Sequence, residues 1–276
     1  MGLRISTNIA SQTVQKNLRK VSNESQGTLE KLSSGKRITK AADDAAGLAI
    51  SKNLEAQTKG LRAATRNAND GISLVQTAEG GLNETSNILT RLRELTVQGG
   101  SDTIGDAERG FLDKEYQQLT TEIERIAQST TFNGSNLLNG DAEEKDIQVG
   151  AFDGEQNRIT FDGGETDATA GAIGVDGTGV SSKEDALDSM STIDEAINMV
   201  SGQRANLGSI QSRLQSTVAN LEIQTLNQDA ARSVIEDVDV AQESAKMASN
   251  NVIKQAGVAT LAQANALPNS ALRLIG

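Results

Sequence analysis

The stretch "VDVAQESAKMASNNVIKQAGVATLAQANA" (residues 238–266) repeats residues that are mostly small and apolar at alternating spacings of three and four. This spacing places them along one face of an α-helix, as in the seam of a coiled coil. We call this set the alanine stripe, and it comprises Val238, Ala241, Ala245, Ala248, Val252, Gln255, Ala259, Ala262 and Ala266. Because alanine side chains are short, the backbone of a partner helix can come close along this face.

A matching repeat lies near the start of the chain, at Val14, Leu18, Val21, Ser25, Thr28 and Leu32. One helix enters the body of the protein and the other leaves it, so we expect the two to pair antiparallel through their stripes. Such a thin pair buries too little apolar area to offset about 1 to 2 kcal/mol of backbone entropy per ordered residue. We therefore expect both ends to be disordered or fraying in a free monomer and to order against other copies, which indicates an assembly protein.

The residues between these ends predict three further helices, at about 44–98, 106–128 and 184–232. The third has apolar residues at strict intervals of seven: Ile193, Val200, Leu207, Leu214 and Leu221. Within the first, "NANDGIS" (67–73) contains an Asn-Asp-Gly signal that predicts a break in the helix. The fold class is therefore mainly α, a long-helix, coiled-coil-like bundle with paired terminal helices.

The middle of the chain has a different pattern. The stretch "IQVGAFDGEQNRITF" (147–161) has two short β-prone runs around Asp-Gly, which predicts a β-hairpin. Residues 162–179 hold six glycines and little to bury, so we expect a loop or small appendage. We divide the chain into paired terminal helices (1–42 and 235–276), a helical bundle (43–140 and 183–234), and the hairpin with its glycine-rich loop (141–182).

Composition excludes several kinds of chemistry. The chain of 276 residues has no His and no Cys, so His-based triads, zinc sites with these ligands and disulfides are impossible. Carboxylate or lysine chemistry and an oxygen-ligand cation site stay open.

Charge is unevenly distributed along the chain. The net charge is −11, yet the first forty residues carry eight Lys or Arg against Glu24 and Glu30. A basic arm suggests nucleic acid or a membrane surface, but this one has no aromatic residue to stack on bases or lie at a bilayer interface. We expect neither a nucleic-acid partner nor stable membrane insertion. The start lacks a secretory signal pattern, which predicts a cytoplasmic protein or one exported by a route that does not use such a signal.

The sharpest carboxylate pair is Asp43 with Asp44. Neighbours in sequence point apart on a helix, so we interpret the pair as a helix N-terminal cap and not as the two acids of a hydrolase. The "SSGKR" stretch (33–37) lacks the spacing of a phosphate loop and predicts a tight turn. The Asp and Gly residues of 153–179 match no calcium-loop spacing, and turn chemistry explains them as well.

Four acids gather where the last helix begins: Glu236, Asp237, Asp239 and Glu243. They are either a solvated helix start or charged partners of the basic arm or of another subunit, and the sequence leaves these alternatives open.

Several long motifs together resemble one family, the bacterial flagellins. They are "LEKLSSGKRITKAADDAAGLAIS" (29–51), "GLRAATRNANDGISLVQTAEGGLNE" (60–84), "LRELTVQ" (92–98), "TTFNGSNLL" (130–138) and "ARSVIEDVDVAQESAKMASNNVIKQAGVATLAQAN" (231–265). The resemblance covers about 1–140 and 183–276 in family order. The family's variable outer domains, which lie between these two parts, are almost absent here.

The resemblance implies a structural subunit of the flagellar filament, outside the cell, with no catalytic residue and no cofactor. It implies that "NANDGIS" lies within a continuous helix, against the turn signal, and that the chain leaves by the flagellar type III apparatus. The implied partners are copies of the same chain, a chaperone at the C-terminal segment, and the cap and hook-junction proteins. A Toll-like receptor 5 contact is implied at Arg91, Leu95 and Glu115.

The resemblance also implies that the paired ends form the filament's inner core and the bundle its wall. The polymerisation residues assigned on this basis are Val14, Leu18, Val21, Leu32, Val238, Ala241, Ala245, Ala248, Val252, Ala259, Ala262 and Ala266. A membrane-active or coiled-coil secreted assembly protein is the alternative that would also explain amphipathic ends. An enzyme that uses a carboxylate pair is the third functional class that the sequence allows.

Overall fold

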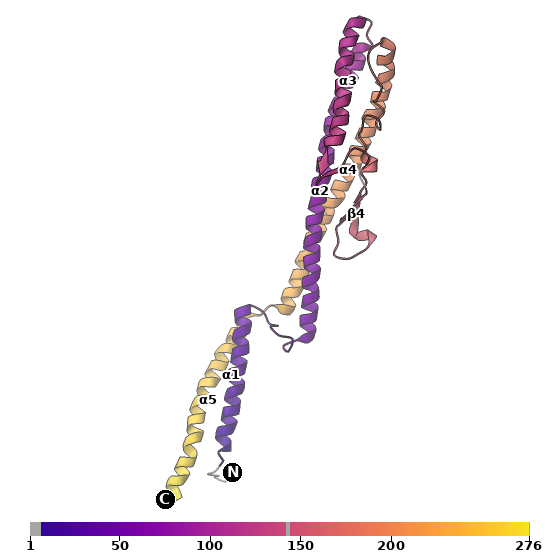
Figure 1. The fold of residues 1–276 in the computed structure, drawn as a ribbon. Coiled ribbons are helices and arrows are strands. Elements are labelled where there is room, and N and C mark those ends of the chain that lie inside the picture. The colour runs from indigo at the N-terminus through magenta and orange to yellow at the C-terminus, as the bar shows by residue number, and fades with distance from the viewer. Residues whose placement is uncertain (1–6, 142–143, 276) are drawn as a thin grey trace. The chain divides into compact units, whose positions relative to one another are not determined.

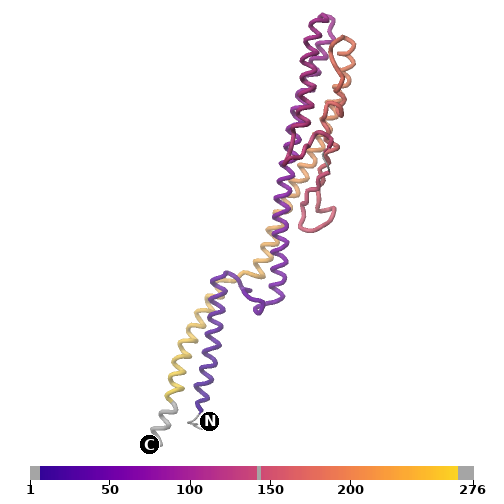
Figure 2. Tube along the Cα trace, viewed as in Figure 1, coloured from indigo at the N-terminus to yellow at the C-terminus, as the bar shows by residue number. Residues whose placement is uncertain are grey.

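The structure is a computed structural model that describes residues 7–141 and 144–275, with side chains described through Ala266. The chain forms two compact units (Figure 1). We call residues 1–56 with 227–276 the terminal unit, and residues 57–226 the bundle unit. The helices are α1 (Ile9–Ser34), α2 (Ala45–Gly99), α3 (Asp106–Ser129), α4 (Lys183–Glu236) and α5 (Val240–Ile275). The predicted mainly helical class is confirmed, and α2 and α4 contribute to both units (Figure 2).

Two small antiparallel ribbons follow α3. Strands β1 (Thr131–Phe132) and β2 (Ser135–Asn136) form the first ribbon, and β3 (Lys145–Gln148) and β4 (Arg158–Phe161) form the second. In the second, Ile147 pairs with Ile159, which confirms the predicted hairpin. Two short 3₁₀ turns complete this region, η1 (Glu155–Asn157) before β4 and η2 (Gly164–Thr166) after it.

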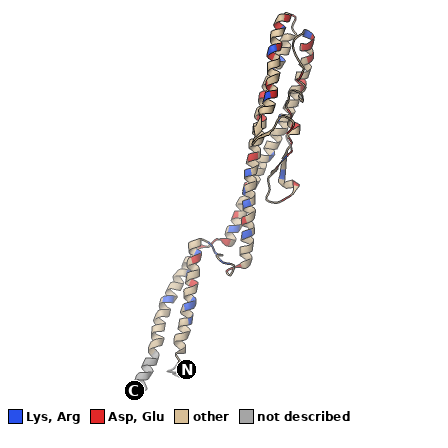
Figure 3. Ribbon diagram, in the orientation of Figure 1, with Lys and Arg blue, Asp and Glu red and all other residues tan. Residues whose placement is uncertain are grey.

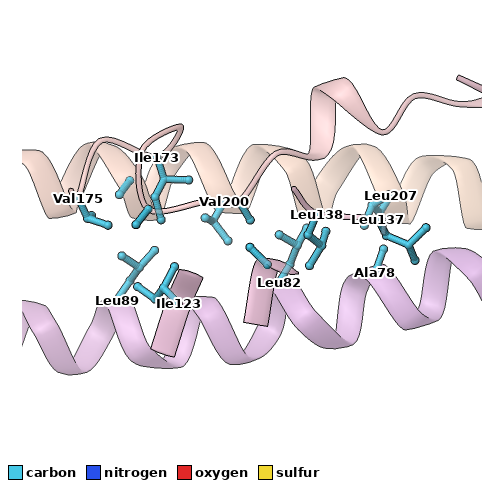
Figure 4. Packing of buried hydrophobic residues seen from close by; sticks show 14 of the residues in the cluster. Ala78, Leu82, Leu89, Ile123, Leu137, Leu138, Ile173, Val175, Val200 and Leu207 are labelled. Atoms are coloured by element: carbon cyan, nitrogen blue, oxygen red, sulfur yellow. The ribbon is translucent and has the colours of Figure 1, made fainter. Parts of the chain in front are cut away.

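The core of the bundle unit joins α2, α3 and α4. All five heptad residues of α4 are buried, and Figure 4 shows Ala78 of α2 opposite Leu207 of α4, with Leu82 and Leu89 further along the α2 side of the core. Burial of one such leucine contributes about 1.5 to 3 kcal/mol. Periodic apolar faces therefore hold together a unit that has few aromatic residues.

The predicted break at 67–73 is wrong, because α2 is continuous through these residues. Ala68 and Val75 are buried in the core there. Gly71 serves packing instead of a turn: a Cβ at this position would lie 2.6 Å from Cδ1 of Ile147 on β3. Burial of this face outweighs the cost of about 1 kcal/mol for a glycine in a helix.

The glycine-rich segment is a loop, which is one of the two predicted alternatives, but the expectation that it has little to bury is wrong. Ala168, Ile173, Val175 and Val180 are buried in the same core as the helices, and Figure 4 shows Ile173 and Val175 beside α4. Glycines with positive φ, such as Gly174 at 77°, let the chain turn between these buried residues. The loop therefore covers part of the bundle that would otherwise expose apolar surface.

Candidate assembly interface

Helices α1 and α5 pack side by side in the terminal unit, and their direction is antiparallel as predicted (Figure 1). Near the start of α1, the Asn8 amide donates to the Ala264 carbonyl at 2.9 Å and the Ser11 hydroxyl donates to Asn265 at 2.8 Å. Asn8 also caps α1, because its side-chain oxygen accepts from the Ser11 amide. Further along, Lys246 and, to a smaller extent, the buried Thr28 of α1 lower the pKa of the Glu243 carboxyl on α5.

The predicted stripe of α1 is the face that α5 covers. Thr28 is buried, and Val14, Leu18, Val21, Ser25 and Leu32 are half-buried. Gly257 permits close approach, because a Cβ there would lie 2.8 Å from Cδ2 of Leu18. The side chain of Leu18 therefore rests against the backbone of α5.

The expectation that the alanine stripe faces α1 is wrong. Apart from half-buried Val238, every stripe residue is exposed. Helix α5 directs another face toward α1, with the buried or half-buried residues Glu243, Ser244, Met247, Asn250, Gly257, Leu261 and Ala264. The sequence pattern did not decide between these faces because the second half of α5 carries apolar residues on several faces and, apart from Arg273, no charge. A helix of this kind is normally enclosed on all sides.

Large apolar side chains on α5 are also exposed. Val240, Val252, Ile253 and Val258 have 60%, 66%, 48% and 57% of their surface exposed. Through Ala266, the charged residues of this helix are Glu243, Lys246 and Lys254, and Figure 3 shows how sparse they are beside those of the bundle unit. Helix α5 thus presents a long, nearly uncharged surface that α1 does not cover.

At the other end of the pair, a buried carboxylate joins three segments of the terminal unit. Glu236, the last residue of α4, is 5% exposed. It forms an ion pair with Lys36 and accepts a hydrogen bond of 2.5 Å from the hydroxyl of Ser51 on α2. We call these three residues the latch. The hydrogen bond from Lys36, followed by that from Ser51, holds the pKa of Glu236 below its ordinary value.

Backbone hydrogen bonds reinforce the latch. The Arg37 amide donates to the Glu236 carbonyl at 2.6 Å, and the Arg37 guanidinium donates to the Ile235 carbonyl. The Val238 amide donates to the carbonyl of Gly35, which ends α1 with φ of 70°. The "SSGKR" stretch is therefore a tight turn, as predicted, and it holds the junction between α4 and α5.

The other acids at this junction have separate roles. Asp239 caps α5 by accepting from the Ala241 and Gln242 amides, and Glu243 pairs with Lys246 at 2.9 Å. Of the two alternatives for these acids, Glu236 is thus a partner of the basic arm and Asp239 belongs to the helix start.

The Asp43–Asp44 pair is structural. Asp44 accepts from the Gly47 amide at 2.8 Å and caps α2, which confirms the predicted cap. Asp43 accepts from the amides of Thr39 and Lys40, and the Thr39 hydrogen bond is the main cause of its lowered pKa.

The acids of 153–179 also serve local turns. Asp162 accepts from the Gly164 amide, Asp167 accepts from Thr169, and Asp153 pairs with Arg158. Among residues 7–141 and 144–275, no three His, Cys, Asp or Glu residues are grouped so that they would hold a metal ion. Turn chemistry therefore accounts for these carboxylates.

The residues implied in receptor contact separate in the structure. Arg91 and Glu115 are exposed and pair with each other at 2.8 Å across α2 and α3. Leu95 is completely buried in the bundle core. The ion pair is therefore accessible at the surface, whereas Leu95 contributes to the packing of the core.

None of the helices in the described part of the chain is long and apolar enough to cross a membrane. A long-helix bundle with an exposed apolar pair of chain ends is typical of a structural subunit that assembles with copies of itself. Comparison with known proteins identifies the family. Residues 5–143 match the bacterial flagellin N-terminal helical region, and residues 190–275 match the bacterial flagellin C-terminal helical region. The chain belongs to the bacterial flagellin family.

Relatives of similar length support this assignment. The chain is 42% identical to a flagellin of Halalkalibacterium halodurans over 98% of this chain and 99% of that one. It is 41% identical to a flagellin of Bacillus subtilis, over 99% and 100%. It is 39% identical to a flagellar filament core protein of Brachyspira hyodysenteriae, over 98% and 99%. The chain is thus a non-enzymatic subunit that polymerises into the flagellar filament outside the cell.

Solved structures share the fold. The crystal structure of Bacillus cereus flagellin matches 60% of this chain and 94% of its own, with a TM-score of 0.51 and 31% identity. A putative flagellar hook-associated protein from Vibrio parahaemolyticus matches 70% of this chain and 99% of its own, with a TM-score of 0.58. At 16% identity, this second likeness concerns the fold alone.

Proposed function

We propose that the α1–α5 pair forms the inner core of the filament and that the bundle unit forms its wall. The exposed apolar face of α5 carries this proposal. The stripe residues from Ala241 to Ala262 and the exposed valines of α5 face away from α1, so other copies of the chain can cover them. Contact between this face and a different face of the next copy lets the array continue instead of closing.

The energetics favour ordering on assembly. Complete burial of a valine contributes about 1.5 to 3 kcal/mol, and side chains that are half exposed in the monomer have a large part of this still to gain. Each copy in a filament has several neighbours, so the gain is repeated along α5. This gain is what offsets the backbone entropy of two thin helices.

The partners implied by the resemblance fit this surface. An uncovered apolar helix in an unassembled subunit is an aggregation hazard, which supports a chaperone that holds the C-terminal segment before type III export. The cap and hook-junction proteins would contact the terminal helices of the subunits at the two ends of the filament. Arg91 and Glu115 supply an exposed polar surface for Toll-like receptor 5, with Leu95 supporting it from within.

Substitution of Val252 tests the proposed inner core. Val252→Asp places a charge where neighbouring copies should exclude water, at a cost of several kcal/mol, since a buried charge without a partner is strongly unfavourable. We expect the concentration needed for polymerisation to rise at least a hundredfold, which corresponds to about 2.7 kcal/mol. The measurement is sedimentation of polymer, with electron microscopy of the pellet.

Val252→Ala is the matched control, because it keeps a small apolar side chain and should raise that concentration much less than Val252→Asp does. Circular dichroism of both variants should match the parent, since Val252 is exposed in the monomer. If Val252→Asp polymerises as readily as Val252→Ala, the stripe does not lie between copies.

A further inference from the structure

A groove of about 240 Å³ runs between α1 and α5 beside their contact. Its walls are Val14, Leu18 and Val21 on α1 and Ile253 and Gly257 on α5. Gly257 has no side chain, so Leu18 lies close to the α5 backbone at this groove. Ile253 remains 48% exposed at this groove.

The groove and the alanine stripe match in chemical character. The two polar residues that line the groove, Asn17 and Thr260, are uncharged, and no charged residue lines it. The stripe has no charged residue either. Charged side chains of a partner would lose their hydration in this groove at a large cost in free energy. Small apolar side chains would bind there without that cost.

The positions of the two surfaces on α5 indicate how copies would connect. At 3.6 residues per turn, the stripe and the α5 wall of the groove lie roughly 120° apart around the helix. One copy therefore offers the stripe on one side and the groove on another. Because the two surfaces differ, their contact is heterologous and extends from copy to copy.

We propose that the groove of each subunit receives the alanine stripe of the next subunit, with Val252 as the side chain that enters it. Val252 is the largest exposed apolar side chain of the stripe, with 66% of its surface uncovered. This inference rests on the proposed inner core and goes further, because it names which surface of one copy meets which surface of the next.

Thiol cross-linking in filaments tests this pairing, and the chain has no native cysteine to interfere. The variant Asn17→Cys/Ala248→Cys carries one thiol at the groove and one in the stripe, a turn from Val252. It is co-assembled with an equal amount of unmodified chain and treated with a short thiol-to-thiol cross-linker. Denaturing gels should show a ladder of dimers and larger multimers. Each single-cysteine variant should stay monomeric, because it lacks the second partner.

Two results would overturn the inference while leaving the inner core in place. The first is the absence of a ladder from filaments of this variant and also from filaments of Thr260→Cys/Ala248→Cys. That result would show that the stripe does not contact the groove. Dimers from Ala248→Cys alone would show that stripe meets stripe. Failure of the inner-core proposal is recognised separately, because Val252→Asp would then still form filaments.

Discussion

Removal of either charge from the latch should destabilise the terminal unit, but by different amounts. Glu236 is 5% exposed, whereas the side chain of Lys36 is 47% exposed. Lys36→Met leaves a buried carboxylate whose remaining hydrogen-bond donor in the latch is Ser51. Glu236→Gln leaves an ammonium group that water reaches, and the new amide still accepts from Ser51. Lys36→Met should therefore be the more harmful change.

The magnitudes follow from this asymmetry. Removal of one partner from a fully buried ion pair costs about 3 to 5 kcal/mol, and a hydrogen bond to a charged group contributes about 1.5 to 3 kcal/mol. Because Lys36 is half exposed, we expect about 2 kcal/mol for Lys36→Met and about 1 kcal/mol for Glu236→Gln. The backbone hydrogen bonds of Arg37 and Val238 remain in both variants, so the turn itself should persist.

Hydrogen exchange measures this directly as the free energy of opening of amides in 45–56 and 227–236. The pKa of Glu236 is lowered in the folded chain, so its contribution is present above its ordinary pKa and is lost as the pH falls through the lowered value. The difference in the free energy of opening between Lys36→Met and the parent should therefore disappear in acid. Equal effects of the two variants, or a larger effect of Glu236→Gln, would refute the reasoning.

Three further predictions concern the bundle and the free ends. Leu95→Ala should destabilise the bundle unit by about 2 to 5 kcal/mol, because the side chain is fully buried. The control Arg91→Ala should leave thermal unfolding nearly unchanged. Similar melting curves for these two variants would contradict the assigned core. Gly71→Ala should cost about 1 to 2 kcal/mol through its clash with Ile147, and added Ile147→Ala should relieve that clash; urea unfolding that shows no coupling between the two sites would be the contrary result. Amides of α1 and α5 should exchange faster in free monomer than amides of the bundle core, and equal protection would show that the ends are stable without neighbours.

The helices and the bundle core could be predicted from the sequence because a periodic apolar face is a local signal. The heptads of α4 are buried as their spacing predicts. The role of Gly71, in contrast, does not follow from a local signal. Its sequence context indicates a turn, and only the position of Ile147 on a distant strand explains a glycine within α2.

The sequence predicted the contact face of α1 but not that of α5. On α1 the apolar stripe is narrow, so the face toward α5 was predicted correctly. On α5 apolar residues surround much of the helix, and the sequence could not decide which face α1 covers. The latch joins residues about 200 positions apart, and the local pattern left open whether Glu236 pairs with the basic arm.

Truncation of residues 258–276 tests most directly the claim that the chain ends assemble while the bundle folds by itself. Purified truncated chain is mixed with filament seeds, polymer is sought by electron microscopy, and the folding of 44–232 is followed by circular dichroism. We expect no filaments and a bundle that melts as in the full chain. Filaments from the truncated chain, or a bundle that unfolds with the loss of the tail, would contradict the account.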